Sequence, residues 1–132
     1  MRQQIAETPT ETVQPTILVA EDNESNFILI EETFKTQQHT IIRAENGLEA
    51  IKIVQSRDDI DLILMDIRMP VLSGYDASKR ISKLRPEIPI IIQSAYAMSK
   101  DIQKAKEAGC CSFIAKPIDP QKLISVVNKF LK

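Results

Sequence analysis

Three carboxylates in this sequence stand at the ends of apolar runs that have the length of β-strands. Glu21 and Asp22 follow the run Thr16–Ala20, and Asp66 follows the run Leu62–Met65. If the two runs are neighbouring strands of a parallel sheet, their carboxyl ends meet at one edge and bring the three acids together. Crowded carboxylates repel one another, and either protonation or a hard cation such as Mg²⁺ relieves that repulsion. The spacing therefore predicts a cation site between two strand ends.

The elements that must position these acids alternate along the chain. Short apolar runs are each followed by a longer segment with apolar residues at helical spacing, which is typical of βα units and a mostly parallel sheet. The pattern predicts a five-stranded, doubly wound α/β fold with five helices. The predicted strands are Thr16–Ala20, His39–Arg43, Ile60–Met65, Pro89–Gln93 and Ser112–Ala115. The predicted helices are Ser25–Lys35, Leu48–Gln55, Tyr75–Leu84, Ser99–Ala108 and Gln121–Leu131.

Length, charge and hydropathy limit the classes of protein to which this chain can belong. With 132 residues, of which 43% are hydrophobic, the chain can form one domain. We predict a flexible lead-in over residues 1–14, rich in Thr, Glu, Gln and Pro, and a folded domain over residues 15–132. A formal net charge of −1 gives no electrostatic basis for binding nucleic acid or an anionic membrane. The chain also lacks a membrane-length apolar stretch and a signal peptide, and Cys110 and Cys111 fit a reducing compartment, so we predict a cytoplasmic protein.

Two further strands end in groups that could complete a site. Ser94 follows the fourth predicted strand and Lys116 follows the fifth, which places a hydroxyl and an ammonium group at the same edge as the acids. Taken singly, such residues are ordinary loop residues or helix caps. Asp66 differs, because an unpaired acid directly after Leu-Ile-Leu-Met is costly to bury. The combination favours a functional crevice.

Four segments in this order carry a resemblance to a known family. They are Ile17–Asn23, Leu64–Pro70 with Gly74, Ser94–Ala95, and Glu107–Gly109 with Lys116–Pro117. From about Pro15 onward the chain resembles the receiver domain of two-component response regulators, especially the receivers at the C-termini of hybrid sensor kinases. The resemblance implies a flavodoxin-like sheet with strand order 2-1-3-4-5.

The resemblance implies roles for the acids. Asp66 corresponds to the phosphoacceptor, which takes a phosphoryl group from a phosphohistidine. Asp22 corresponds to a direct Mg²⁺ ligand and Glu21 to a ligand that acts through water. Asp66 and the backbone carbonyl of Arg68 complete the ligand set, with Mn²⁺ as an alternative ion.

The resemblance also implies roles for the remaining crevice residues. Lys116, in a cis peptide bond with Pro117, and Ser94 would hold the phosphoryl oxygens. Ser94 and Phe113 would form the switch, although Thr and Tyr are more usual in the family at these two positions. Arg68 and Tyr96, each two residues beyond a site residue, would tune the lifetime of the phosphoryl group.

The implied partners are proteins. A sensor histidine kinase or a phosphotransfer domain would donate the phosphoryl group, and a downstream protein would bind the face built from the fourth helix, fifth strand and fifth helix. A phosphorylation-dependent dimer also fits.

Transfer and autodephosphorylation would be self-catalysed, so the domain is not a conventional enzyme. The sequence ends just after the last predicted helix, so it fits either a stand-alone receiver or a receiver excised from a hybrid kinase. The resemblance favours the second. In that case the full-length protein would tether the domain to a membrane kinase.

Three alternative classes share some of these features. A flavodoxin-like FMN binder would offer hydroxyls and glycines after its first strand, whereas Glu21-Asp22-Asn23-Glu24 would repel a phosphate. A phosphatase with an aspartate nucleophile would have a general acid two residues after Asp66, where this chain has Arg68. A pseudo-receiver that only binds partners is the second hypothesis. His39 is interpreted as a surface residue and not as a phosphorelay histidine.

Overall fold

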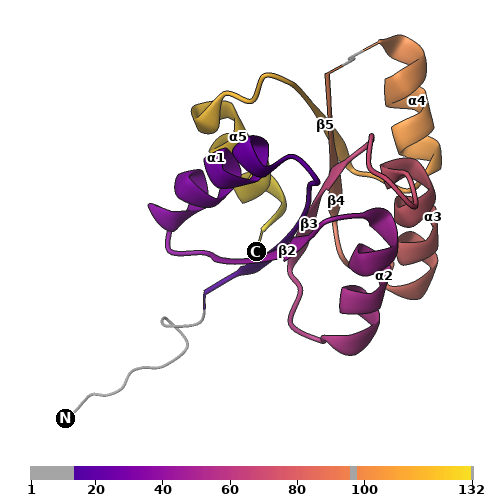
Figure 1. Cartoon of the computed structure of the whole chain (residues 1–132), viewed down its shortest axis with the longest axis horizontal. Coiled ribbons are helices and arrows are strands. Elements are labelled where there is room, and N and C mark those ends of the chain that lie inside the picture. The colour runs from indigo at the N-terminus through magenta and orange to yellow at the C-terminus, as the bar shows by residue number, and fades with distance from the viewer. Residues whose placement is uncertain (1–13, 96–97, 132) are drawn as a thin grey trace.

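A parallel sheet of five strands forms the centre of the molecule and carries helices on both faces (Figure 1). The computed structural model describes residues 14–95 and 98–131. The elements are β1 Thr16–Ala20, α1 Glu24–Lys35, β2 Thr40–Ala44, α2 Gly47–Ser56, β3 Leu62–Asp66, α3 Gly74–Leu84, β4 Ile90–Ser94, α4 Ser99–Glu107, β5 Ser112–Ala115 and α5 Pro120–Phe130. Each predicted boundary lies within two residues of the observed one, and the α/β fold is confirmed.

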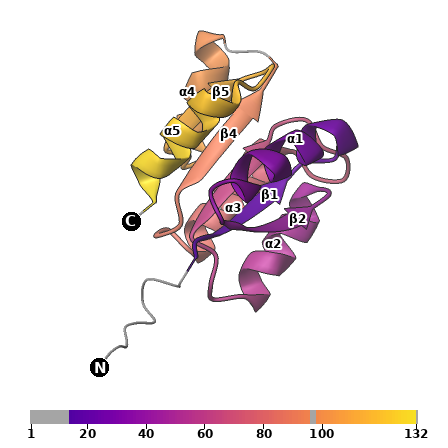
Figure 2. The same ribbon diagram turned by 90° about the vertical axis from the view of Figure 1, so that its left-hand side faces the viewer.

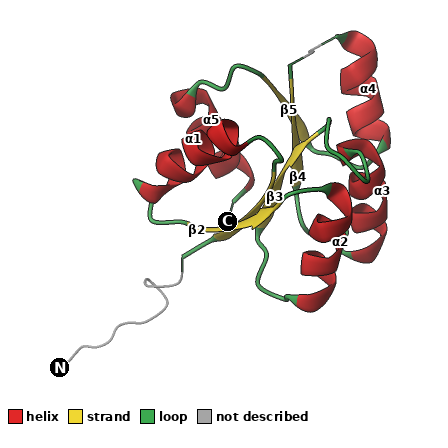
Figure 3. Ribbon diagram, in the orientation of Figure 1, coloured by secondary structure: helices red, strands yellow, loops and turns green. Residues whose placement is uncertain are grey.

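The strands lie in the order β2-β1-β3-β4-β5, and each neighbouring pair is parallel. Figure 3 shows the strands as one sheet between the helices. This is the predicted order. The chain passes from β1 to β2 on one side and then crosses to β3 on the other side of β1. Ligands of open parallel sheets bind at the carboxyl ends of the strands, where the order reverses. In this sheet that point lies between β1 and β3.

Side chains alternate between the two faces of the sheet and form two apolar layers. The layer with Leu18, Ile63 and Ile92 packs beneath α2, α3 and α4. The layer with Ile17 and Leu64 packs beneath α1 and α5. Figures 1 and 2 show these two groups of helices on opposite sides of the sheet. Because both faces are covered, β1, β3 and β4 are buried along their whole length, and their apolar runs show no alternation.

Helices begin close behind the strand ends because side chains cap their first turns. The side chain of Asn23 accepts a hydrogen bond of 2.8 Å from the backbone N–H of Asn26 and starts α1. Asp119 caps α5 in the same way, accepting 3.0 Å from the N–H of Gln121. These caps fix the loops that follow β1 and β5. None of the helices in the described ranges is both long and apolar enough to span a bilayer.

The start of α3 lies against the end of β3 and requires a glycine. A Cβ atom on Gly74 would lie 2.1 Å from the carbonyl oxygen of Asp66. The N–H of Gly74 donates 2.9 Å to the carbonyl of Ile67 and closes the intervening loop. Because only glycine permits this approach, Gly74 sets the shape of the loop after Asp66.

Candidate functional site

The carboxylates of Glu21, Asp22 and Asp66 converge at the switch point of the sheet. One oxygen from each lies within 4.8 Å of the others. Glu21 and Asp66 are buried, while Asp22 is exposed. The pairing of β1 with β3 aligns Ala20 with Met65, so the residues that follow them meet at the same edge. The arrangement is an all-oxygen cluster with one side open to solvent.

Lys116 lies between the two buried acids. Its Nζ atom is 3.1 Å from Oδ1 of Asp66 and 3.4 Å from Oε1 of Glu21. The Lys116–Pro117 peptide is cis. The N–H of Lys116 donates 2.7 Å to the carbonyl of Ser94, which ties the loop after β5 to the end of β4. The ammonium group of Lys116 therefore faces both buried carboxylates.

Glu21 is fully buried, and several groups fix its position. The Nδ2 group of Asn26 donates to Oε1, and the backbone N–H of Asn23 donates 3.2 Å to Oε2. Its own N–H donates 2.9 Å to the carbonyl of Ala44, while Nε of Arg43 donates 3.2 Å to its carbonyl. The sequence analysis missed Asn26. The signal was present, because an asparagine in the first turn of a helix that follows an acidic loop points back at that loop.

The pKa of Asp66 reflects its burial and its charged neighbours. Burial, together with the negative charge of Glu21, raises the pKa of its carboxyl from 3.8 to about 6, and Lys116 opposes this rise. A divalent cation among the three carboxylates would relieve the same repulsion. The donor set consists of oxygen atoms alone, which is what Mg²⁺ requires, so the residues present fit a magnesium site.

The crevice opens into a hollow of about 560 Å³ at the carboxyl edge of the sheet. Its lining includes the three acids and the two other residues predicted from strand ends, Ser94 and Lys116, together with Arg68. Ser94 is buried and forms the last residue of β4. The structure thus places the acids, a hydroxyl and an ammonium group around one cavity large enough for a phosphoryl group.

Comparison with known proteins decides the family. Residues 17–128 match the family model of the response regulator receiver domain. The chain belongs to this family. The polar-differentiation response regulator DivK of Brucella anthropi is 35% identical over 118 residues, which cover 87% of this chain and 94% of DivK.

Solved receiver structures share the fold. CheY4 of Vibrio cholerae superposes with a TM-score of 0.85 at 22% identity and covers 90% of this chain and 100% of its own. The receiver domain of sensor histidine kinase PA1611 from Pseudomonas aeruginosa is 30% identical, with a TM-score of 0.82 over 89% of this chain and 98% of that domain. The PA1611 structure has a magnesium ion coordinated in its active site cleft. This chain is therefore a receiver domain of two-component signalling.

Phe113 lies outside the crevice of this receiver domain. It is half-buried on β5 and borders a small cavity of about 60 Å³ together with Ile102 and Ala105 of α4. Phe113 packs against the apolar layer beneath α2, α3 and α4. The aromatic ring thus contacts the α4 side of the sheet. Tyr96, which the sequence analysis placed at the border of the crevice, lies outside the described residues.

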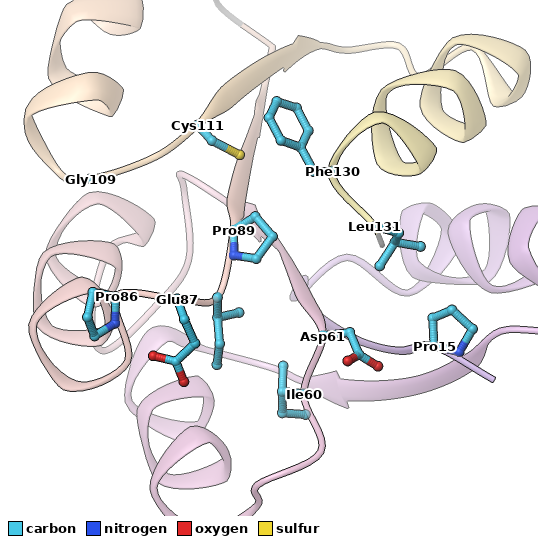
Figure 4. Close-up of a pocket in the computed structure, with 11 residues that line it drawn as sticks. Pro15, Ile60, Asp61, Pro86, Glu87, Pro89, Gly109, Cys111, Phe130 and Leu131 are labelled. Atoms are coloured by element: carbon cyan, nitrogen blue, oxygen red, sulfur yellow. The ribbon is translucent and has the colours of Figure 1, made fainter. Parts of the chain in front are cut away.

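A second cavity, of about 620 Å³, lies at the opposite edge of the sheet (Figure 4). Its lining is mainly apolar and includes Phe130. Its two carboxylates are already engaged, since Asp61 accepts 2.8 Å from the N–H of Thr16 and Glu87 pairs with Arg85 at 2.6 Å. Both carboxylates among the described lining residues therefore already have a partner.

His39, which the sequence analysis expected at the surface, is half-buried. Its ring stacks on Phe34 with 5.5 Å between centroids, and both ring nitrogens are buried without a hydrogen-bond partner in the described part of the chain. The loop after α1 folds back, with the N–H of His39 donating 3.2 Å to the carbonyl of Phe34. This contact partly covers the ring, which the polar sequence around it did not predict.

Proposed function

We propose that this receiver domain accepts a phosphoryl group onto Asp66 in a Mg²⁺-dependent reaction with a phosphohistidine donor. The observation that carries the proposal is the position of the Asp66 carboxylate, which is buried between Glu21 and Lys116 at the open end of the sheet. A carboxylate held there faces a hollow on one side and an ammonium group on the other. This is the arrangement that a carboxylate nucleophile needs.

In the proposed reaction, a carboxylate oxygen of Asp66 attacks phosphorus and forms an acyl phosphate. The P–N bond of the donor breaks, and the departing imidazole takes its electron pair. Lys116 balances the charge on the phosphoryl oxygens and the Ser94 hydroxyl donates a hydrogen bond to them, since phosphoryl transfer depends mainly on positioning and charge neutralisation. Loss of the group by hydrolysis returns the free carboxylate, so transfer and autodephosphorylation are self-catalysed.

The proposed ligand set for Mg²⁺, with Mn²⁺ as an alternative, is Asp22, Asp66 and the backbone carbonyl of Arg68, with Glu21 acting through water. The ion would supply positive charge opposite the phosphoryl oxygens. The convergence of three carboxylates supports this assignment. The magnesium site named for the PA1611 receiver domain is a second support.

Ser94 and Phe113 are proposed as the switch. Alternation along the strands places Ser94 on the same face as Ile92, and Phe113 pairs with Ile92 in register. Both residues therefore belong to the α4 face of neighbouring strands. A shift of the Ser94 hydroxyl toward the phosphoryl group would free space beside Phe113 and alter the α4-β5-α5 face. Arg68 and Tyr96 are proposed to tune the phosphoryl lifetime.

The proposed donor is a sensor histidine kinase or a phosphotransfer domain. Receiver domains act with such proteins, and the receiver domain of Ssk1 from Saccharomyces cerevisiae, crystallised with the phosphotransfer protein Ypd1, is 26% identical to this chain with a TM-score of 0.83. A downstream protein would bind the α4-β5-α5 face, with a phosphorylation-dependent dimer as a further consequence of the switch.

We also propose that the domain is part of a hybrid kinase, and a single likeness supports this. The likeness to the PA1611 receiver domain supports it, at 30% identity. In that arrangement the domain acts in the cytoplasm, tethered through its kinase. The likeness to DivK supports the stand-alone alternative. Phosphoryl uptake by Asp66 is the same in either case.

The experiment is intact-protein mass spectrometry after incubation with acetyl phosphate or phosphoramidate, in Mg²⁺ or in EDTA. We expect a Mg²⁺-dependent phosphoryl adduct on the wild type and none on Asp66→Asn. Asp58→Asn, which neutralises an exposed acid before β3, is the matched control and should take up the group normally. If the folded wild type binds Mg²⁺ yet forms no adduct, the chain is a pseudo-receiver that only binds partners.

A further inference from the structure

Gln93 is a buried polar residue beside the phosphoacceptor. It is 1% exposed and pairs in register with Asp66 across β3 and β4. Its neighbour two residues earlier, Ile91, belongs to the apolar layer beneath α1 and α5, so alternation places Gln93 in that layer as well. The same argument from Leu64 places Asp66 there. Gln93 therefore lies next to Asp66, on the same face of the sheet.

A chain of carboxamides connects Gln93 to the acid cluster. The Nδ2 group of Asn26 donates to Oε1 of Glu21 and lies 3.5 Å from Oε1 of Gln93. An ionised Glu21 can only accept, so Asn26 must present its NH₂ group to it. The same NH₂ group then faces the oxygen of Gln93. The charge on Glu21 thus fixes the orientation of both amides.

The position of Gln93 costs stability. Its Nε2 group is buried and has no hydrogen-bond partner among the described residues. An unsatisfied buried donor is unfavourable, and an apolar side chain would avoid that penalty. The register neighbour Ile114 on β5 and Ile91 on β4 are both apolar and buried. A carboxamide at this one position of an apolar layer points to a role in the adjacent site.

We propose that Gln93 is a positioning residue for the cation site. Its side-chain oxygen orients Asn26, and Asn26 in turn holds the carboxylate of Glu21 toward the other two acids. The proposal rests on the proposed function, because it concerns the Mg²⁺ affinity of the same site. Partners that orient metal ligands from outside the coordination sphere typically contribute about 10-fold to 100-fold in affinity.

The test is an NMR titration of amide shifts with MgCl₂, which reports both Mg²⁺ affinity and folding. Gln93→Met removes the carboxamide at similar length, and Asn26→Ala removes the middle group from a half-buried position on α1. The double variant combines them. Ile91→Val is the matched control, since it perturbs the same face of β4 and leaves the relay from Gln93 through Asn26 to Glu21 unchanged.

We expect each single variant to raise the Kd for Mg²⁺ about 10-fold. The double variant should bind no more weakly than Asn26→Ala, because Gln93 acts through Asn26. Ile91→Val should stay within about 2-fold of the wild type, even where it lowers the unfolding midpoint.

Three results would overturn the inference. A Kd for Gln93→Met within about 2-fold of the wild type would show that the carboxamide does not position the site. Effects that multiply in the double variant would show that Gln93 does not act through Asn26. An unchanged Kd for Asn26→Ala refutes the relay even if Gln93→Met fails to fold. These results leave the proposed function standing, whereas a wild type that binds no Mg²⁺ removes both.

Discussion

Neutralising Asp66 should stabilise the protein. The folded state holds Asp66 with a pKa of about 6, against an ordinary value of 3.8, because the carboxyl is buried next to Glu21. The folded protein therefore binds this proton more tightly than the unfolded chain does. By linkage, the free energy of unfolding falls as pH rises through the window between the two values and stays low above it.

The size of the effect follows from the shift. Each tenfold change in proton affinity is worth about 1.4 kcal/mol, so the ionised carboxylate destabilises the fold by about 3 kcal/mol above pH 6. Asparagine keeps the shape of Asp66 and carries no charge. Lys116 retains Glu21 as a partner at 3.4 Å. We expect Asp66→Asn to exceed the wild type in unfolding free energy by up to about 3 kcal/mol at pH 8 and to match it near pH 4.

The assay is urea unfolding followed by circular dichroism at both pH values, in EDTA. The same assay is repeated with Mg²⁺ in place of EDTA. Mg²⁺ should stabilise the wild type at pH 8, because a ligand that binds the folded state adds to its stability. It should have a much smaller effect on Asp66→Asn. Asp58→Asn should stay within about 0.5 kcal/mol of the wild type throughout. An Asp66→Asn variant no more stable than the wild type at pH 8 would refute the claim that burial and the charge of Glu21 make the ionised Asp66 unfavourable.

Three further predictions test the surroundings of the site. Gly74→Ala should lower the unfolding free energy by about 1–3 kcal/mol in urea, because its Cβ would meet the carbonyl of Asp66 at 2.1 Å; an unchanged midpoint would contradict the close approach. Burial holds the pKa of His39 below 6.5, so stability should fall as pH drops below that value, and His39→Phe should flatten this fall in pH-dependent unfolding. Lys116→Met should slow adduct formation from acetyl phosphate about 100-fold in mass spectrometry. It should also tighten Mg²⁺ binding in an NMR titration, since a cation near the site is lost. A normal rate of adduct formation would argue against a role of Lys116 in phosphoryl transfer.

The strand ends were predictable because their signals are local. An apolar run followed by an acid, such as Leu62–Met65 before Asp66, reveals both the strand and the group that it delivers. The βα alternation then fixes which end of the sheet carries the chemistry. Ser94 and Lys116 could be placed at that edge by the same rule.

The groups that hold the acids were only partly predictable. Asn26 could have been recognised, because it lies five residues after Glu21 in the first turn of α1. Gln93 could not, because it meets Asn26 only where α1 docks against the end of β4, and the two residues are 67 positions apart in the sequence. His39 shows the same limit, because its burial depends on the loop after α1 folding back onto Phe34.

The end of β4 connects the crevice to both layers of helices. Gln93 and Ser94 are consecutive, so their side chains point to opposite faces of the sheet. Gln93 faces the α1 side, where Asn26 and Glu21 lie, and Ser94 faces the α4 side, where Phe113 lies. The proposed cation site and the proposed switch thus meet at one strand end. If both proposals hold, a change of charge at Asp66 would reach the α1 side and the α4 side through two adjacent residues of β4.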